Sequence, residues 1–225
     1  NEVFFHYITH KTPFVVLKYA MTLDGKIAAH TGDSRWVTGE AARRHVHETR
    51  NRLSGIMVGV GTVLADDPLL TCRIDGGRNP VRIVCDSHAR TPLGSQLVQT
   101  ANEIPTYVAV TARSERTAAL EEKGVRILVC GETDGHVDLT DLMQQLGSAG
   151  INGILLEGGS SLAFSALKAG IVRRVQAYIA PKLIGGADAK SPVGGEGLAK
   201  MADALALKNV RSTPLGEDFL IEGRL

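Results

Sequence analysis

The chain has 225 residues, a mass of 23.9 kDa and a formal net charge of +1, and 44% of its residues are hydrophobic and 22% charged. These values are typical of a soluble globular domain, and a nearly neutral chain without a run of basic residues argues against nucleic acid as a partner. No apolar segment approaches the roughly 18 residues that a membrane-spanning helix needs, so no membrane partner is expected.

The cysteines do not form a recognisable pattern. Cys72, Cys85 and Cys130 are far apart and include no C-x-x-C pair, which favours reduced thiols in a cytoplasmic protein over disulfides or a zinc site. His6 and His10 have helical spacing but no third ligand nearby, so they are interpreted as surface residues rather than metal ligands. No metal is expected.

The first elements in chain order contain one unusual residue. Residues 1–12 show no clean period and are interpreted as a lead-in or inter-domain linker, and residues 14–20 form a β-rich run. Lys18 interrupts that run, and a lysine in a buried strand is unfavourable unless it has a partner or a function. Residues 31–37 form a polar loop. Its Trp36 either covers a ligand or, as the sequence alone favours, plugs an edge of the core.

A helix is predicted over residues 40–52, and a second buried strand over residues 54–61 leads into a helix start at 62–68. The Gly59-x-Gly61 pair is a weak dinucleotide signal, because Leu64 stands where the third glycine would be. Asp66 lies at the end of this helix, where the helix dipole disfavours an acid.

The rest of the chain alternates between strands and helices. Residues 69–73 are a loop or a short strand. Further strands are predicted over 81–85, 105–110, 125–130, 154–157 and 174–180, and helices over 114–123 and 138–149. Two apolar-alternating runs, 204–211 and 218–225, flank a predicted turn at 213–216 and suggest an antiparallel hairpin. The fold class is therefore one three-layer α/β domain, with a mostly parallel sheet of about eight or nine strands and an antiparallel C-terminal edge.

Residues 153–170 read as a buried strand, a glycine turn and a helix closed by Gly170. Gly158 and Gly159 allow positive φ and a close ligand approach, and the first amides of the helix lack intrahelical partners. Such a turn suits an anion, and Glu157 places a carboxylate at the same strand end. An ordinary capped β–α turn remains the alternative.

Six stretches in register resemble one known family, the reductase half of the bifunctional bacterial riboflavin-biosynthesis deaminase/reductase. They are L-K-Y-A-M-T-L-D-G-K (17–26), T-G-D-S-R-W (31–36), G-V-G-T-V-L-A-D-D-P (59–68), P-V-R-I-V-C-D-S (80–87), E-G-G-S-S (157–161) and A-P-K-L-I-G-G (180–186). The resemblance covers residues 13–225.

The resemblance implies a dihydrofolate-reductase-like fold, NADPH as cofactor and a phosphoribosyl-pyrimidine substrate. The expected reaction reduces the ribosyl group of 5-amino-6-(5-phosphoribosylamino)uracil to ribityl. In that family a deaminase domain precedes the reductase, but its zinc signature, H-x-E followed by P-C-x-x-C, is absent here. Residues 1–12 are therefore expected to be the linker from a missing N-terminal deaminase domain and 13–225 the reductase domain. A homodimer is also expected from the family, with the C-terminal hairpin as a candidate interface.

The resemblance also implies roles for single residues. Lys18 and Asp66 match the reacting centre, although a plain Lys–Asp ion pair is the alternative. The substrate-contacting positions correspond to Ser34, Arg50, Leu70, Arg73 and Glu157. The cofactor-contacting positions correspond to Ala20, Trp36, Thr62, Asp66, Ser87, Gly159, Ser160, Ser161, Leu162, Ala163, Phe164 and Ser165. NADPH also needs a cation for its 2′-phosphate, which the sequence does not identify.

Two further functions stay open. The first is a related reductase that acts before deamination, on the 2,5-diaminopyrimidinone ribosyl phosphate. The second is a non-catalytic NADP-binding module, which unchanged activity after Lys18→Ala or Asp66→Ala would support. Dihydrofolate itself is a poorer substrate candidate, because Ser34, Arg50 and Arg73 suit a phosphorylated one.

Overall fold

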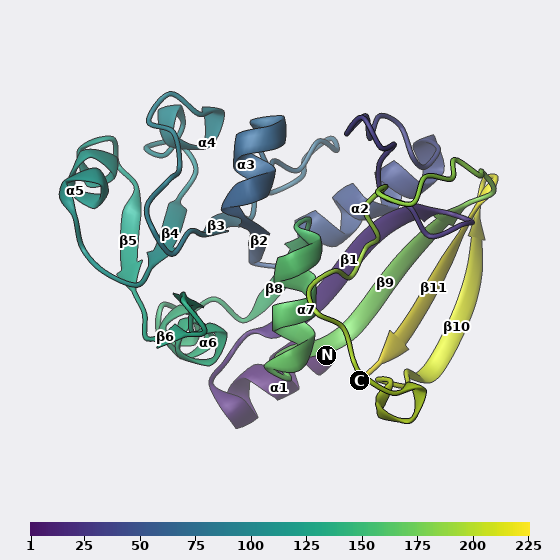
Figure 1. The fold of residues 1–225 in the computed structure, drawn as a ribbon. Coiled ribbons are helices and arrows are strands. Elements are labelled where there is room, and N and C mark those ends of the chain that lie inside the picture. The colour runs from purple at the N-terminus through teal and green to yellow at the C-terminus, as the bar shows by residue number, and fades with distance from the viewer. The chain divides into compact units, whose positions relative to one another are not determined.

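The computed structural model describes residues 1–225, which fold into two compact units. The first unit comprises residues 1–14 and 48–156, and the second comprises residues 15–47 and 157–225. Helix α2 (Glu40–Arg52) and strand β8 (Gly153–Glu157) each contain a boundary between the two units. Figure 1 labels the elements along the chain.

The first unit contains parallel strands in the order β8-β2-β3-β4-β5. Besides β8, these are β2 (Gly55–Gly59), β3 (Val81–Cys85), β4 (Thr106–Val110) and β5 (Arg126–Val129). A small antiparallel pair, β6 (Glu132–Thr133) and β7 (His136–Val137), follows β5. The short apolar runs of β2 to β4 are almost entirely buried, as expected for parallel strands covered on both faces.

Two of the five helices of the first unit, α5 (Glu115–Glu122) and α6 (Leu139–Ser148), begin with a side-chain cap. The other three are α1 (Glu2–His10), α3 (Val60–Asp66) and α4 (Gln96–Gln99). Ser114 forms a capping box with Thr117 at the start of α5, and the Asp138 carboxylate accepts hydrogen bonds from the amides of Thr140 and Asp141 at the start of α6. The side chains of β2, β3, β4 and α5 share one apolar cluster.

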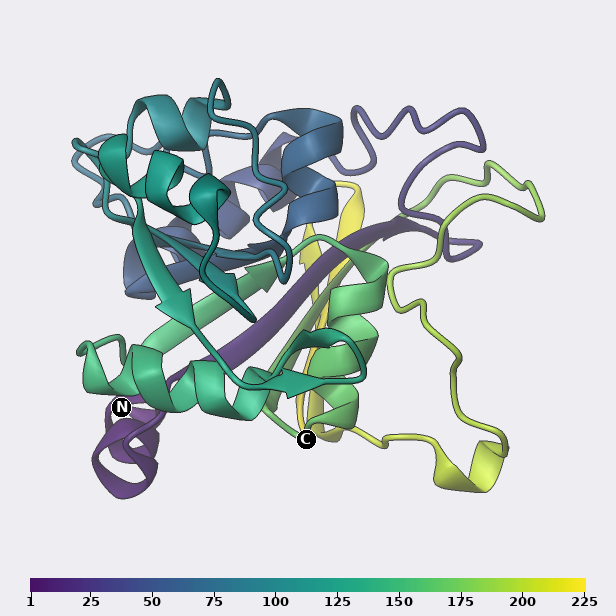
Figure 2. The same cartoon turned by 60° about the vertical axis from the view of Figure 1, so that its left-hand side comes forward.

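The second unit contains strands in the order β1-β9-β11-β10, and Figure 2 shows the long C-terminal hairpin beside β9. Its strands are β1 (Phe14–Thr22), whose first residue belongs to the first unit, β9 (Val172–Ala180), β10 (Lys208–Leu215) and β11 (Asp218–Arg224). β1 and β9 are parallel, whereas β9, β11 and β10 are antiparallel. Helix α7 (Ser160–Lys168) and the short 3-10 helix η1 (Met201–Asp203) complete the unit.

The predicted fold class is confirmed. Apart from the small β6–β7 pair, the two units contain nine strands, mostly in parallel pairs, that alternate with helices, and the chain ends in an antiparallel hairpin. The predicted strands over 81–85 and 105–110 and the helices over 114–123 and 138–149 agree with the observed elements to within one residue at each end.

Several boundaries were predicted wrongly. Val60 and Gly61 begin α3 instead of ending β2. The hairpin turn lies at residues 216–217, because Leu215 pairs directly with Asp218, and Gly216 has φ +66°. Pro214, which we had placed in the turn, pairs with Phe219 inside β10. A proline is tolerated there because β10 is an edge strand.

Helix α1 was not predicted, because residues 1–12 show no clean hydrophobic period. Tyr7 donates its hydroxyl hydrogen to the carbonyl oxygen of Gly147, and His6 packs edge-on against Phe14. These contacts lie within the first unit, so tertiary packing stabilises a helix that the sequence pattern does not show. The assignment of residues 1–12 as a linker stays a prediction.

Candidate functional site

The strand–turn–helix segment that the sequence singled out has the predicted local geometry. β8 ends at Glu157, the two following glycines have φ values of +82° and +84°, and α7 begins at Ser160. Gly159 is the N-cap residue, and no side chain caps the first amides of α7. These amides and the positive end of the helix dipole suit an anionic group.

A second glycine pair lies against α7 in the second unit. The Gly194 amide donates a hydrogen bond to the carbonyl oxygen of Ser160, and a Cβ atom at Gly195 would collide with the ring of Phe164. The 194–195 segment therefore contacts two of the predicted cofactor positions, whereas Ser161 and Ser165 are exposed. No functional role was predicted for Gly194 or Gly195 from the sequence.

Lys18 has a carboxylate partner in the second unit. Its Nζ lies 3.4 Å from Oε2 of Glu157, and the two side chains are 17% and 10% exposed. The same ammonium group lies 5.8 Å from the ring centroid of Tyr178, whose hydroxyl is 2.7 Å from Nδ1 of His45. A nearly buried cation thus has both a carboxylate and an aromatic face, which explains how a lysine is accommodated in β1.

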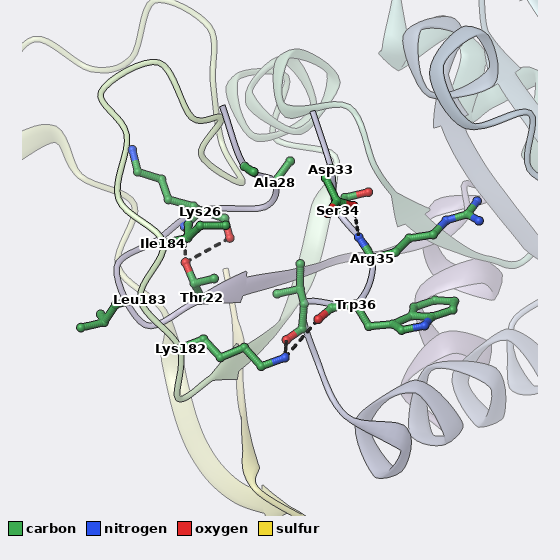
Figure 3. A pocket seen from close by; sticks show the side chains of 12 residues that line it. Thr22, Lys26, Ala28, Asp33, Ser34, Arg35, Trp36, Lys182, Leu183 and Ile184 are labelled. Carbon is green, nitrogen blue, oxygen red and sulfur yellow. Dashed lines mark hydrogen bonds between the residues drawn. The ribbon is translucent and has the colours of Figure 1, made fainter. Parts of the chain in front are cut away.

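Ser34 and Trp36 line one cavity of about 300 Å³ in the second unit. Figure 3 shows this cavity between the loop that contains Lys26 to Trp36 and the segment that contains Lys182 to Ile184. Lys26, Asp33 and Lys182 also line it, so its wall contains both cationic and anionic groups.

Two side chains join those segments. Nζ of Lys182 donates hydrogen bonds to the carbonyl oxygens of Trp36 and Val37, at 3.0 and 2.9 Å. The Asp24 carboxylate accepts hydrogen bonds from the amides of Ile184 and Gly185 and from the hydroxyl of Thr22. The Thr22 hydroxyl and then these amides lower the pKa of Asp24 below its usual value. Lys182 belongs to the quoted A-P-K-L-I-G-G stretch, but nothing in its local sequence indicates which loop it contacts.

Trp36 does not plug the core, so that prediction was wrong. Its side chain is 61% exposed, and the guanidinium carbon of Arg43 lies 4.7 Å from its ring centroid. Arg43 also donates a hydrogen bond to the carbonyl oxygen of Thr38. The indole is therefore held by a cation–π contact at the surface of the second unit.

The first unit contains the remaining predicted residues. Thr62 and Asp66 lie on α3, with Asp66 exposed in its last turn, and the next segment contains Leu70 and Arg73. Nη1 of Arg50 donates a hydrogen bond to the carbonyl oxygen of Thr71, which places the Arg50 side chain beside that segment. Lys18 and Asp66 belong to different units, and their common role at the reacting centre stays a prediction.

A buried arginine that the sequence analysis missed stabilises this part of the first unit. Arg82 is fully buried and donates hydrogen bonds to the hydroxyls of Thr100 and Thr106 and to four carbonyl oxygens, those of Leu69, Leu97, Thr100 and Ile104. Burial lowers the pKa of Arg82 to about 10. The sequence does contain a signal for this buried arginine, because Arg82 is a basic residue inside the apolar stretch V-R-I-V-C. Lys18 was noticed for the same reason.

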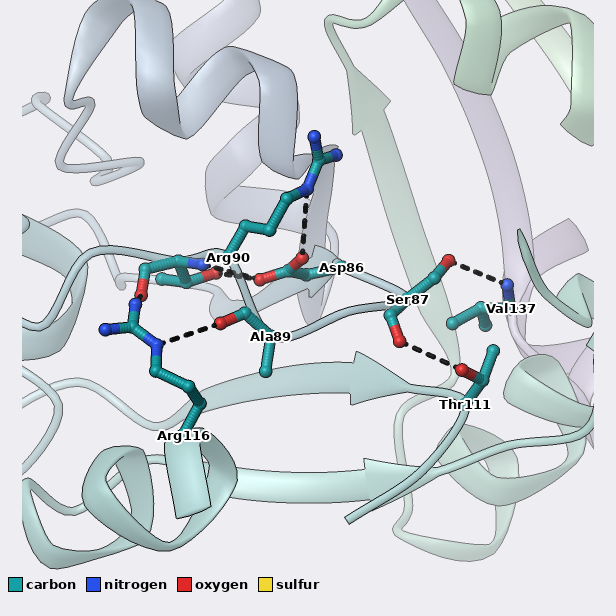
Figure 4. Close-up of polar contacts among 8 residues, drawn as sticks. Asp86, Ser87, Ala89, Arg90, Thr111, Arg116 and Val137 are labelled. Carbon is teal, nitrogen blue, oxygen red and sulfur yellow. Dashed lines mark hydrogen bonds and ion pairs between the residues drawn. The ribbon is translucent and has the colours of Figure 1, made fainter. Parts of the chain in front are cut away.

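Ser87 follows β3, and its polar atoms are bonded within the first unit. Its hydroxyl oxygen accepts a hydrogen bond from the amide of Val137, and its carbonyl oxygen accepts two from Thr111 (Figure 4). Because the hydroxyl acts as an acceptor here, its own hydrogen remains available to a ligand.

The three thiols are free, and no cluster of three or more His, Cys, Asp or Glu residues could hold a metal ion. Burial, followed by the neighbouring Cys130, raises the pKa of Cys85 to about 12, and burial likewise raises that of Cys130 to about 12. None of the helices has the length and apolar character needed to span a bilayer.

The elements and the glycine turn define a mixed α/β protein with a candidate nucleotide-binding turn. Residues 13–221 match the model of the RibD C-terminal domain, and the chain belongs to this family. The family resemblance inferred from the six motifs is confirmed.

Individual relatives agree with this assignment. The chain is 53% identical to the riboflavin biosynthesis protein RibD of Actinobacillus pleuropneumoniae, over 99% of this chain and 59% of that protein. It is 47% identical to the 2,5-diamino-6-ribosylamino-4(3H)-pyrimidinone 5′-phosphate reductase of Methanothermobacter thermautotrophicus, over 93% of this chain and 97% of that protein.

A solved structure from Thermotoga maritima superimposes with a TM-score of 0.80 and 33% identity, over 99% of this chain and 59% of that one. It is a diaminohydroxyphosphoribosylaminopyrimidine deaminase/5-amino-6-(5-phosphoribosylamino)uracil reductase. The chain thus spans less than two thirds of the Actinobacillus and Thermotoga proteins, but nearly all of the Methanothermobacter reductase.

Proposed function

We propose that the chain is an NADPH-dependent reductase of riboflavin biosynthesis. Its proposed reaction reduces the ribosyl group of 5-amino-6-(5-phosphoribosylamino)uracil to ribityl. The observation that carries this proposal is the Lys18–Glu157 pair, a nearly buried ion pair at the end of a strand and one glycine turn from an uncapped helix start, in a chain of the RibD C-terminal domain family.

The donor set of the second unit suits a dinucleotide. The free amides at the start of α7 fit a pyrophosphate, and the positive φ values of Gly158 and Gly159 allow its close approach. When bound, NADPH supplies a hydride for C1′ of the opened ribose. Trp36 offers an exposed indole beside the cavity that Ser34 lines, and we assign Trp36 to the cofactor and Ser34 to the substrate.

Lys18 and Glu157 would act together on the substrate. The Lys18 ammonium can donate a proton or a hydrogen bond to the ribose oxygen as the ring opens, and Glu157 orients that ammonium group. A carboxylate can accept several hydrogen bonds, so Glu157 can also accept one from a pyrimidine N–H. The guanidinium groups of Arg50 and Arg73 suit the 5′-phosphate of the substrate. We assign Asp66 as a second catalytic residue because it lies in the family motif G-V-G-T-V-L-A-D-D-P.

A second substrate has a specific observation in its favour. The Methanothermobacter relative, which this chain matches over 97% of its length, is named for the 2,5-diaminopyrimidinone and is therefore a reductase of the compound before deamination. The two substrates differ in the pyrimidine, the part that we assign to Glu157.

Turnover with both pyrimidines tests the proposal. The folded protein is mixed with NADPH and either phosphoribosylamino-pyrimidine, and NADPH oxidation is followed together with product mass. We expect oxidation with the uracil compound. Faster turnover of the diaminopyrimidinone would favour the second reductase, and binding of NADPH without turnover of either would favour a non-catalytic module.

We further propose that the protein forms a homodimer, acts in the cytoplasm and is preceded by a deaminase domain in its full-length form. Strand β10 is an exposed edge strand, and Val210 and Phe219 on the hairpin are about half exposed, which suits an interface between two copies. Light scattering on the purified chain would distinguish a dimer from a monomer.

A further inference from the structure

The loop after β3 is a rigid turn in the first unit. Asp86 is fully buried, and its Oδ2 accepts hydrogen bonds from both the amide and the hydroxyl of Thr91, each at 2.7 Å. The Ala89 amide donates to the carbonyl oxygen of Asp86, and Ala89 has φ +52°. The loop is therefore closed from inside by one carboxylate, as Figure 4 shows.

Arg116 on α5 holds the same loop from outside. Its Nε donates to the carbonyl oxygen of Ala89 and its Nη2 to that of Thr91, at 3.3 and 3.0 Å. Two opposed anchors, Asp86 and Arg116, leave the loop little freedom. The side chains that it exposes are presented in a fixed position at the carboxyl end of β3.

Three arginines lie in this region, and they differ in what they bind. Arg116 donates to two loop carbonyls, and Arg113 forms an ion pair with Glu121 at 2.7 Å. Arg90 makes no hydrogen bond within the protein, and its side chain is 60% exposed. Its guanidinium is thus the one of the three that presents both Nη groups to a ligand.

Arg90 is nevertheless oriented by a buried charge. Oδ1 of Asp86 has no hydrogen-bond partner, and Nε of Arg90 lies 4.0 Å from it. An attraction at Nε directs the two Nη groups away from the loop. That end of the guanidinium is the planar fork that binds phosphate in a bidentate manner.

We propose that Arg90 binds the 2′-phosphate of NADPH and thereby selects NADPH over NADH, with Asp86 as its positioning residue. This inference rests on the proposed function. Ser87, three residues before Arg90, is a predicted cofactor contact with a hydroxyl hydrogen available to donate, and ligands of parallel α/β folds bind beyond the carboxyl ends of the strands. The Nη groups of Arg90 fit a phosphomonoester dianion, and the Asp86 carboxylate acts only on Nε, at the opposite end of the guanidinium.

Binding measurements on matched variants test the inference. Dissociation constants for NADPH, NADH and 2′,5′-ADP are measured by calorimetry with the wild type, Arg90→Ala and Arg113→Ala. We expect Arg90→Ala to weaken NADPH and 2′,5′-ADP by about 10- to 100-fold, the range for loss of a charge-assisted contact, and to leave NADH unchanged. Arg113→Ala removes the same charge nearby and should change none of the three.

The outcomes separate this inference from the proposed function. If the wild type prefers NADPH but Arg90→Ala keeps that preference, the assignment of Arg90 is wrong and the reductase proposal stands. Equal weakening of NADPH and NADH by Arg90→Ala would also overturn it. If the folded wild type binds neither nucleotide, both proposals fail.

The role of Asp86 has its own test. Asp86→Asn keeps an acceptor for Thr91 but removes the charge that attracts Arg90. It should reduce NADPH affinity and leave NADH affinity unchanged, whereas a purely structural role would alter both or neither. Circular dichroism and the melting temperature confirm that each variant is folded.

Discussion

Nζ of Lys18 on β1 lies 3.4 Å from Oε2 of Glu157, the residue that ends β8. Removal of either partner removes a charge–charge attraction from a nearly buried position. We expect Lys18→Met and Glu157→Gln each to destabilise the protein by about 1–3 kcal/mol, below the roughly 3–5 kcal/mol of a fully buried pair because both side chains retain some exposure. Urea unfolding of both single variants and the double variant measures this coupling.

The same two substitutions should affect catalysis more than stability. Lys18→Met is expected to lower kcat by about 10²- to 10⁴-fold, the range for a lost proton donor or charge stabiliser. Tyr178→Phe keeps the aromatic face under Lys18 and should retain most of the activity. Wild-type kcat in folded Lys18→Met would show that Lys18 has only a structural role.

The hydrogen bonds from Lys182 to Trp36 and Val37 predict a fluorescence signature. Trp36 is the only tryptophan, so intrinsic emission reports on this loop alone. Lys182→Ala should release the loop, increase acrylamide quenching of Trp36 and raise the KM for substrate more than it lowers the melting temperature. Lys168→Ala removes another exposed lysine of the same unit, one that pairs with Glu196, and serves as the control. Identical quenching in the two variants would contradict the proposed role of Lys182.

Arg82 should be essential for the stability of the first unit. Arg82→Met removes the six hydrogen bonds of a fully buried side chain, and we expect a loss of about 4 kcal/mol or more in the free energy of unfolding. Arg82→Lys keeps the charge but cannot reach as many acceptors, so its loss should be smaller. Denaturant titration compares them, and a melting temperature of Arg82→Met within a degree or two of wild type would argue against this network.

The buried thiols predict an alkaline limit to stability. The folded-state pKa values of Cys85 and Cys130 are raised from 9.0 to about 12, so each group favours the folded state fully below pH 9 and loses that contribution as pH rises toward 12. Deprotonation of Arg82, whose pKa is lowered, acts in the opposite direction above about pH 10. We expect stability to fall above pH 9 and the fall to be shallower in Cys85→Ala; an unchanged profile in that variant would count against the thiol's contribution.

Thiol labelling provides an independent check. At pH 8 a thiol with a pKa of about 12 is ionised in roughly one molecule in ten thousand, so Cys85 and Cys130 should react slowly in the native protein. Rapid labelling should be confined to Cys72 and disappear in Cys72→Ser. Unfolding should make all three thiols reactive, and fast labelling of two or more sites before unfolding would contradict the raised pKa values of Cys85 and Cys130.

The sequence predicted most of the first unit because its signals are local. Residues 81–85 form a short apolar run, and Ser114 and Asp138 are cap residues directly before their helices, so periodicity and capping place these elements. The hairpin turn was placed wrongly because a proline in isolation favours a turn. Pro214 instead lies within β10, where it is tolerated only because β10 is an edge strand.

The candidate site was less predictable, because its contacts join residues far apart in the chain. Lys18 was recognised as unusual, yet its partner Glu157 lies 139 residues away and was assigned to the substrate alone. Lys182 contacts a loop 145 and 146 residues earlier, and no local pattern indicates that pairing. Arg82, like Lys18, is a cationic residue in an apolar strand, but the family resemblance implied no role for it.

The fate of the hydride tests the proposed reductase activity directly. NADPH deuterated at its transferable position is incubated with the folded protein and each phosphoribosylamino-pyrimidine, and the product is analysed by NMR. We expect one deuterium at C1′ of a ribityl product, with the signal reduced by about 10² or more in Lys18→Met. Absence of deuterium at C1′ with both pyrimidines, in protein that is folded and binds NADPH, would contradict it.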